Sequence, residues 1–334
     1  MISLRQAQDI ISLGLVKGAV AGLIGAGVGM GLTAGVRLAM RLPAWDPGWA
    51  VTVGTLVGLL CYLWGLGAFR GWMRWVLAQP EKESREPTSG WTRYFSFDTN
   101  HKVIGVQYMV TSLLIMAIAG VYALMGRLEM AQPGMQFMGP GTYNSLVSLH
   151  GIMMLGAVLV GISGMMNYLV PLMIGARDMA FPRLNALSYW FIPPAVFLLI
   201  LSLPAGGFDT GWTAYPPLSV RAPLGMQLML LAFYLVGLSS IVGSINLIVT
   251  ILRLRAPGMG LFRMPIFVWA AMATAFLQLT FTQFIGTAFL MVALERVMGM
   301  GFFDPDKGGN VILYQHLFWI YTHPAVYNFD QPGL

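Results

Sequence analysis

Long apolar stretches with almost no charge constrain this chain more than any other feature of its sequence. They cover about residues 10–36, 49–72, 103–126, 144–172, 186–204, 225–252, 264–294 and 310–328. Roughly 20 apolar residues in a helix cross a hydrocarbon core about 30 Å thick, and a helix satisfies its own backbone hydrogen bonds there. The sequence therefore predicts an all-α fold: a polytopic bundle of about eight transmembrane helices, surrounded by membrane lipid.

The composition excludes several other classes of protein. The chain is 57% hydrophobic and only 10% charged, unlike a soluble globular protein. Its net charge of +6 lies mostly in the segments between the apolar stretches, so we expect no nucleic-acid partner. The one cysteine, Cys61, lies inside an apolar stretch, which excludes a disulfide framework and a cysteine-based metal site.

The distribution of basic residues predicts the orientation in the membrane. The segment from Arg70 to Lys102 is rich in arginine and lysine, and so are the loops around Arg177 and around Arg253. The intervening loops carry fewer basic residues. Because loops rich in basic residues stay in the cytoplasm, we expect the N-terminus to be cytoplasmic.

One polar segment breaks the apolar pattern and predicts the domain organisation. Residues 79–100 form a stretch rich in charge, proline and serine. We expect this stretch to be a cytoplasmic linker. It would separate an N-terminal transmembrane hairpin, residues 1–78, from a transmembrane core, residues 101–334.

Histidines are the first candidates for chemistry, and the chain has four: His101, His150, His316 and His323. An ionisable group inside a membrane span is costly, which makes it a functional candidate. His150 lies inside an apolar stretch, and imidazole is a good axial ligand for heme iron. The following Gly151 would let a flat macrocycle approach the backbone. A histidine that only hydrogen-bonds within the bundle is the alternative.

The last apolar stretch combines two histidines with a proline. His316 and His323 are seven residues apart, hence two helical turns and roughly one face. Pro324 follows directly and frees a backbone carbonyl one turn earlier, a break that membrane helices tolerate where a cavity or cofactor uses the freed group. The segment Asn328–Leu334 is polar and predicts a turn.

The segment Trp319–Tyr327, with the sequence Trp-Ile-Tyr-Thr-His-Pro-Ala-Val-Tyr, resembles the sixth core helix of heme-copper terminal oxidase (cytochrome c oxidase) subunit I. The resemblance implies that His323 binds copper and that Tyr327 is a redox-active phenol joined to the histidine ring. The spacing suits both roles, because residues i and i+4 lie on one helix face and imidazole suits copper.

The resemblance extends from Thr92 to Tyr327 and implies roles for other residues. His150 would be an axial ligand of the low-spin heme, and Arg127 would contact the formyl group of that heme. Trp319 would also belong to the cofactor-binding residues. The cytoplasmic mouth of a proton channel would consist of Asp178, Asn167 and Asn185. The implied cofactors are low-spin heme A, high-spin heme A and copper.

The chain departs from the common form of this copper motif at one position. The common form has glutamate two residues after the copper-binding histidine, whereas this chain has Ala325. A subfamily with Tyr-Ser-His-Pro uses a tyrosine hydroxyl in place of that carboxyl. Tyr321 and Thr322 are the matching pair here, so the resemblance implies that they form the inner relay of the channel.

The resemblance implies a catalytic role in respiration. It covers the first six helices of a twelve-helix subunit, preceded by two extra N-terminal helices, so we expect residues 101–334 to be a truncated core. The implied function is part of a terminal oxidase in the bacterial cytoplasmic (inner) membrane, which reduces dioxygen to water with proton pumping and electrons from cytochrome c. Other oxidase subunits, and a second half of subunit I on another chain, would supply the remaining metal ligands.

Two alternatives to this function stay open. The first is an inactive fragment or a non-catalytic membrane protein that acts as an assembly partner. The second is a member of the same family that oxidises quinol in place of cytochrome c.

Overall fold

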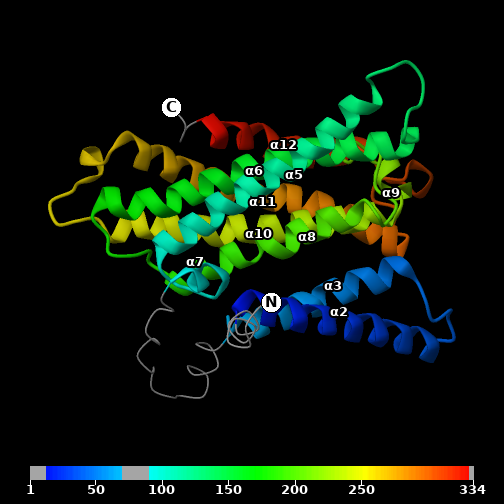
Figure 1. The fold of residues 1–334 in the computed structure, drawn as a ribbon, viewed down its shortest axis with the longest axis horizontal. Helices are drawn as coiled ribbons and strands as arrows, with labels where there is room; N and C mark the ends of the chain where they lie inside the picture. The colour runs from blue at the N-terminus through cyan, green and yellow to red at the C-terminus, as the bar shows by residue number, and fades with distance from the viewer. Residues whose placement is uncertain (1–12, 70–89, 331–334) are drawn as a thin grey trace, which may run out of the picture. The chain divides into compact units, whose positions relative to one another are not determined.

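The computed structural model describes residues 13–69 and 90–330. All regular secondary structure within these ranges is helical (Figure 1). Seven helical segments among the described residues are long and apolar enough to cross a membrane. The predicted fold class, a helical transmembrane bundle, is therefore confirmed.

The candidate membrane spans follow the chain in order. They are α2 (Gly14–Ala39), α3 (Pro47–Leu66), α5 (His101–Glu129), α6 (Pro140–Ile174), α7 with α8 (Pro182–Trp190 and Ile192–Ser202), α10 (Leu224–Arg253) and α11 (Ile266–Met298). The short helices are η1 (Trp91–Phe95), α9 (Leu218–Arg221), η2 (Leu261–Arg263) and η3 (Pro305–Lys307), and the last helix is α12 (Val311–Asp330).

Three details differ from the sequence-based expectation. The eighth predicted span is a helix, α12, but it is not one of the seven apolar spans, because polar residues such as Gln315 and His316 lower its hydropathy. The fifth span is two helices that meet at Phe191, because Pro193 and Pro194 lack the N–H groups that would continue α7. Residues 328–330 continue α12 where a turn was predicted; residues 331–334 lie outside the described residues.

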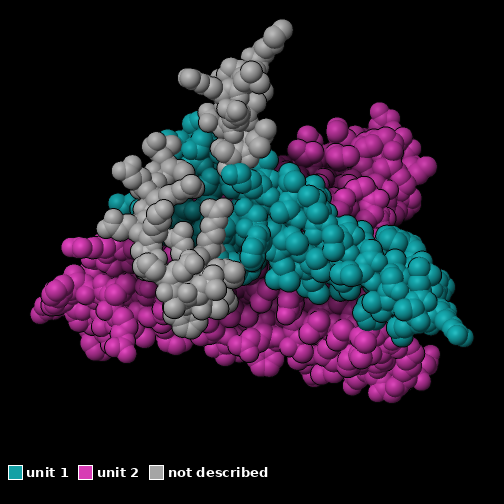
Figure 2. Space-filling view, turned by 90° about the horizontal axis from the view of Figure 1, so that it is seen from below, with its two compact units in different colours: residues 1–103 teal, residues 104–334 magenta. Residues whose placement is uncertain are grey.

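The chain divides into two compact units, Met1–Val103 and Ile104–Leu334 (Figure 2). The described part of the first unit contains α2 and α3, which belong to the predicted hairpin over residues 1–78. Residues 79–89 of the predicted linker lie outside the described residues. The proposed limits of the hairpin, linker and core therefore stay predictions.

In the first unit, α2 and α3 pack through small residues. A Cβ atom on Gly29 would lie 2.9 Å from the Cα atom of Gly54, and one on Gly25 would lie 2.6 Å from the side chain of Cys61. Small residues at such positions let membrane helices approach closely. Glycine is therefore required along this seam.

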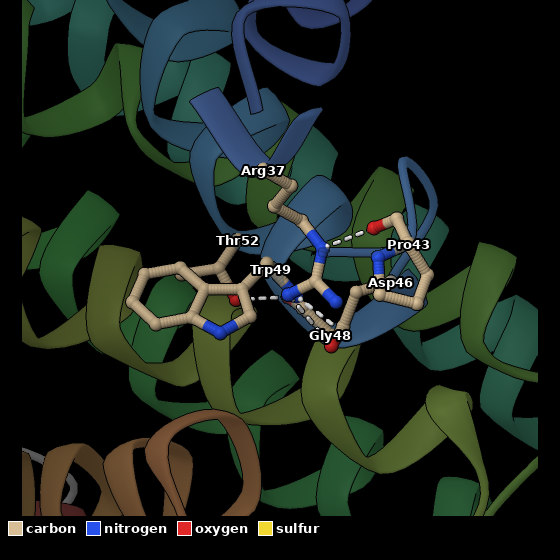
Figure 3. Close-up of polar contacts among 6 residues, drawn as sticks. All are labelled: Arg37, Pro43, Asp46, Gly48, Trp49 and Thr52. Carbon is tan, nitrogen blue, oxygen red and sulfur yellow. Dashed lines mark hydrogen bonds and ion pairs between the residues drawn. The ribbon is translucent and has the colours of Figure 1, made fainter. Parts of the chain in front are cut away.

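The turn between α2 and α3 is closed by side chains (Figure 3). Arg37 donates from Nε to the carbonyl of Pro43 over 2.8 Å and pairs through Nη1 with Asp46 Oδ2 over 3.2 Å. Asp46 is also the N-cap of α3 and accepts a hydrogen bond from the backbone N–H of Trp49, which satisfies an amide that the helix leaves unpaired. Arg37 and Asp46 thereby connect the end of α2 to the start of α3.

In the larger unit, α10 packs against α6, α7, α8 and α11 (Figure 1). Its residues from Gly225 to Ala232 are all buried. An apolar cluster joins α6, α10 and α11 near one end, with Val170, Ile251 and Val268 among its buried members. These contacts hold in place the helices that carry the candidate site.

Candidate functional site

A cavity of about 490 Å³ lies among α6, α10, α11 and α12 in the larger unit. The residues that line it are mostly apolar, and they include three glycines: Gly156 on α6, Gly237 on α10 and Gly286 on α11. The polar side chains that line the cavity include those of Ser240, Thr282, Gln283, Tyr321 and Thr322. A largely apolar cavity with few polar groups is the usual form of a binding site.

On α12, the structure brings the two residues of the predicted copper motif together. The Nε2 atom of His323 lies 3.2 Å from the hydroxyl oxygen of Tyr327, and their rings are nearly perpendicular, with centroids 5.4 Å apart. Both side chains are exposed. Since Tyr327 contacts Nε2, the Nδ1 atom is the one left for a metal.

Tyr321 and Thr322, the predicted inner relay, both line the cavity, and so does Ala325. The Thr322 hydroxyl donates to the carbonyl of Phe318 over 2.8 Å. Tyr321 lies next to Thr282 of α11. The position that the common motif gives to glutamate is therefore buried against the same space that these hydroxyls line.

Trp319, the third residue assigned on α12, belongs to an aromatic cluster beside the cavity. Its indole N–H donates to the hydroxyl of Tyr215, and its ring contacts Trp212 edge to face, with centroids 6.1 Å apart. Phe318 packs against both tryptophans. These contacts fix the orientation of Trp319 on a side of α12 that is otherwise exposed.

His150 is half-buried on α6, where its ring is held by α5. The Nδ1 atom lies 2.9 Å from the carbonyl oxygen of Ala119. A carbonyl can only accept, so Nδ1 carries the proton and the Nε2 lone pair is left for a metal. This is the usual second contact of a metal-binding histidine, and it fits an axial ligand of heme iron.

The surroundings of His150 include two glycines and the predicted Arg127. A Cβ atom on Gly151 would lie 3.7 Å from the side chain of Trp212, an ordinary van der Waals distance, so the role expected of Gly151 stays a prediction. A Cβ atom on Gly120, next to Ala119 on α5, would meet nothing within 4 Å. Arg127 is exposed in the last turn of α5, about 12 Å along the helix from Ala119 at 1.5 Å per residue.

The three residues of the predicted proton entrance lie at one end of the larger unit. Asp178, between α6 and α7, accepts a hydrogen bond from the backbone N–H of Met179 over 2.7 Å. Asn167 is buried on α6 and donates to the carbonyl of Ser163. Asn185 on α7 is 0% exposed, and its amide oxygen and nitrogen have no hydrogen-bond partner in the described ranges.

A second cavity, of about 30 Å³, lies among α5, α6, α10 and α11. Asn167 and Met179 line it together with polar side chains that sequence reasoning missed: Tyr108, Ser239, Ser240, Ser244 and Gln278. Polar residues at helical spacing inside apolar stretches were the signal that could have found them. The cavity has the size and the polar partners to hold a water molecule.

Tyr108 organises the wall of this small cavity. Its hydroxyl donates to Ser188 Oγ over 3.0 Å and lies 3.2 Å from Ser239 Oγ. Ser239 in turn donates to the carbonyl of Ser188 over 2.7 Å. The network joins α5, α7 and α10 around a polar interior.

The donor set of the described residues fits part of a metal centre. No three His, Cys, Asp or Glu side chains gather there closely enough to hold a metal ion. His323 fits one ligand of a copper site, and His150 fits one axial ligand of a heme.

Comparison with known proteins identifies relatives over the same region. Residues 103–334 match the protein family described as "Cytochrome C and Quinol oxidase polypeptide I". "Cytochrome c oxidase subunit 1" of Thermostichus vulcanus is 48% identical over 240 residues, which cover 71% of this chain and 44% of that protein.

Two more relatives have similar names and match a similar share of this chain. "Cytochrome c oxidase subunit 1" of Synechocystis sp. is 45% identical over 254 residues, covering 75% of this chain and 46% of that protein. "Probable cytochrome c oxidase subunit 1-beta" of Nocardia farcinica is 41% identical over 259 residues, covering 75% and 43%. The chain thus spans less than half the length of these curated relatives.

Proposed function

Because this chain belongs to the cytochrome c and quinol oxidase polypeptide I family, we propose that it forms part of the catalytic subunit of a respiratory terminal oxidase. The complex would reduce dioxygen to water, pump protons and take electrons from cytochrome c. The observation that carries the proposal is the contact of His323 with Tyr327 on α12, within a chain whose relatives are named cytochrome c oxidase subunit 1.

We assign the metal-binding roles from the free nitrogen atoms of two histidines. His150 would hold the low-spin heme A through Nε2, with Arg127 at the edge of that heme. His323 would bind copper through Nδ1, with Tyr327 held against its other nitrogen. When bound, heme A in its low-spin and high-spin sites and copper supply the electron transfer and the binding of dioxygen. Trp319 would orient the cofactor side of α12 through its bond to Tyr215.

The proton path would begin at Asp178 and end at Tyr321 and Thr322. A carboxylate at the surface of the bundle collects protons, and the amides of Asn167 and Asn185 would order water behind it. The buried, unpaired amide of Asn185 supports this, because buried polar groups are nearly always hydrogen-bonded to protein or water. Tyr327 would deliver a proton and an electron at the copper site.

The partners in this proposal follow from the incomplete donor set. The high-spin heme and two more imidazoles for copper would need residues beyond His150 and His323. Other oxidase subunits, or a second part of subunit I, would contribute them in the bacterial cytoplasmic membrane, with the N-terminus of this chain in the cytoplasm. The family description names quinol as well as cytochrome c, and the three relatives named above favour cytochrome c.

Copper content tests the assignment of His323. The variant His323→Ala in the assembled complex should lose nearly all copper, because one of the few imidazole ligands is gone. His316→Ala is the matched control, since His316 is exposed on the same helix two turns away and has no assigned role. Elemental analysis that finds full copper in His323→Ala, or the same loss in both variants, contradicts the assignment.

A further inference from the structure

The α11 helix carries a buried polar stripe that the assigned residues do not explain. Thr274, Gln278 and Thr282 follow at four-residue spacing, so they lie on one helix face. They are 0%, 6% and 2% exposed. Polar atoms buried in a membrane bundle are costly unless they find partners, so their role has to be sought in the cavities that they line.

Gln278 is placed to hold a water molecule in the small cavity. Its Oε1 atom accepts a hydrogen bond from Ser244 over 3.2 Å, which fixes the orientation of the amide. The amide nitrogen is then the donor of this side chain, and Gln278 lines the cavity of about 30 Å³, so a water molecule there can accept its hydrogen bond. A water molecule there would have Tyr108 and Ser239 as further polar neighbours.

Thr282 differs from three other threonines in the helices of this unit. The hydroxyls of Thr250, Thr287 and Thr322 donate to the carbonyl one turn earlier, over 2.7 to 2.8 Å. The Thr282 hydroxyl is buried and makes no hydrogen bond of ordinary geometry to any described residue, although it lies next to the phenol of Tyr321. It is therefore available to both Tyr321 and a water molecule.

The two cavities share one wall. Ser240 on α10 lines the small polar cavity and also the large cavity that contains Thr282 and Tyr321. Gln278 and Thr282 are one turn apart on α11, about 6 Å at 1.5 Å per residue. A water molecule at Gln278 and one more near Ser240 would span that separation.

We propose that Gln278 and Thr282 connect the proton path from the small cavity to Tyr321. Gln278 is a positioning residue that holds the water molecule. The water molecule takes a proton from the path behind it and gives one to the Thr282 hydroxyl, Thr282 gives its own to the Tyr321 oxygen, and Tyr321 releases its phenolic proton onward into the large cavity. Each oxygen therefore forms one O–H bond and breaks another, and none of them ends with a changed charge. The inference rests on the proposed oxidase function. It assigns to α11 part of the proton transfer that a glutamate at position 325 carries out in the common form of the motif.

The test is the rate of proton uptake by the assembled oxidase. Thr282→Val keeps the shape of the side chain and removes the hydroxyl. It should slow the uptake that a pH-indicator dye reports during oxidation of the reduced enzyme by about 100-fold, the lower end of what a positioned proton donor contributes. Thr282→Ser should restore the rate close to that of the wild type, and the heme spectrum and copper content should stay unchanged in both.

Thr274→Val is the matched control, because Thr274 is equally buried and unpaired but lines neither cavity. Its uptake should equal that of the wild type. Fast uptake in Thr282→Val, slow uptake in Thr282→Ser, or equal slowing in Thr274→Val each overturns the inference. A wild-type complex that reduces no dioxygen overturns the proposed function and the inference with it.

Gln278→Leu keeps the test decisive if Thr282→Val does not assemble. It should slow proton uptake and remove the water molecule from the small cavity in an experimental structure at a resolution that shows water. A wild-type structure with no water at Gln278, or a Gln278→Leu variant with normal uptake, overturns the role of Gln278.

Discussion

The helix pairs α2–α3 and α10–α11 show two ways of packing neighbouring membrane helices. Between α2 and α3, backbone lies against backbone, as the 2.9 Å approach at Gly29 and Gly54 shows. Between α10 and α11, side chains keep the helices apart, and a hydrogen bond from Ser244 to Gln278 joins them beside a cavity. A glycine seam leaves no room for water, whereas a side-chain interface can enclose it.

The two kinds of packing occur in different units: the glycine contacts lie in the first unit, and the polar contacts near the candidate site lie in the larger unit. Each candidate site residue lies in the larger unit, where polar side chains such as Tyr108, Ser188 and Ser239 hold one another. The described part of the hairpin is joined by small residues and by one closed turn (Figure 3). Changes in the two units should therefore be detected by different measurements.

The largest effect is expected at His150. His150→Ala removes the imidazole that the carbonyl of Ala119 orients, and it should abolish the absorption of the low-spin heme in the reduced-minus-oxidised spectrum of the assembled complex. The helix content should not change. His316→Ala, which removes an exposed histidine of the same unit, should leave the spectrum as it is. An unchanged spectrum in His150→Ala would refute the ligand assignment.

A smaller effect is expected in the glycine seam, and it concerns stability alone. Gly29→Ala should lower the free energy of unfolding in detergent by about 1–3 kcal/mol, because the new methyl group meets backbone atoms that cannot move aside. Gly31→Ala, on the same helix but with nothing within 4 Å of its Cβ position, should be neutral or stabilise by up to about 1 kcal/mol through helix propensity. Equal destabilisation by both changes would contradict the close packing of α2 against α3 at Gly29.

The smallest effects compare one connecting segment from each unit. Glu129 at the end of α5 is buried and accepts hydrogen bonds from the backbone N–H groups of Gln136, Phe137 and Met138. Glu129→Gln removes the charge from these bonds and should lower the free energy of unfolding, since bonds to charged groups are the stronger ones.

Asp46→Asn in the hairpin turn should cost less. Asparagine caps a helix as well as aspartate, so only the partly exposed ion pair to Arg37 is lost, which contributes about 0–1 kcal/mol. The comparison needs both unfolding curves in the same detergent. A larger loss in Asp46→Asn than in Glu129→Gln would show that the turn, and not the buried carboxylate, is the stronger connection.

Much of the fold could be predicted from the sequence, because a membrane span is a property of one contiguous segment. Within residues 13–69 and 90–330, each predicted stretch corresponds to helical structure. The exceptions come from local chemistry that an apolar average does not show: Pro193 and Pro194 divide the fifth span, and the polar residues of α12 lower its hydropathy.

The candidate site was predictable where it is local to one helix. His323 and Tyr327 meet because they are four residues apart on α12. Contacts between helices were not predictable in the same way. Gly151 lies near the side chain of Trp212, and that depends on how the segment before α9 folds back against α6.

The sequence by itself determined the class of this protein, its helical segments, its motif and the family to which the motif points, because these depend on composition and on spacing along single helices. Only the tertiary structure decided which nitrogen of His150 is free, which side chains enclose the small cavity, and that Thr282 of α11 lies next to Tyr321. Those features depend on contacts between residues far apart in the chain, and helix packing sets them, since one face of each helix must meet a partner that its own sequence does not specify.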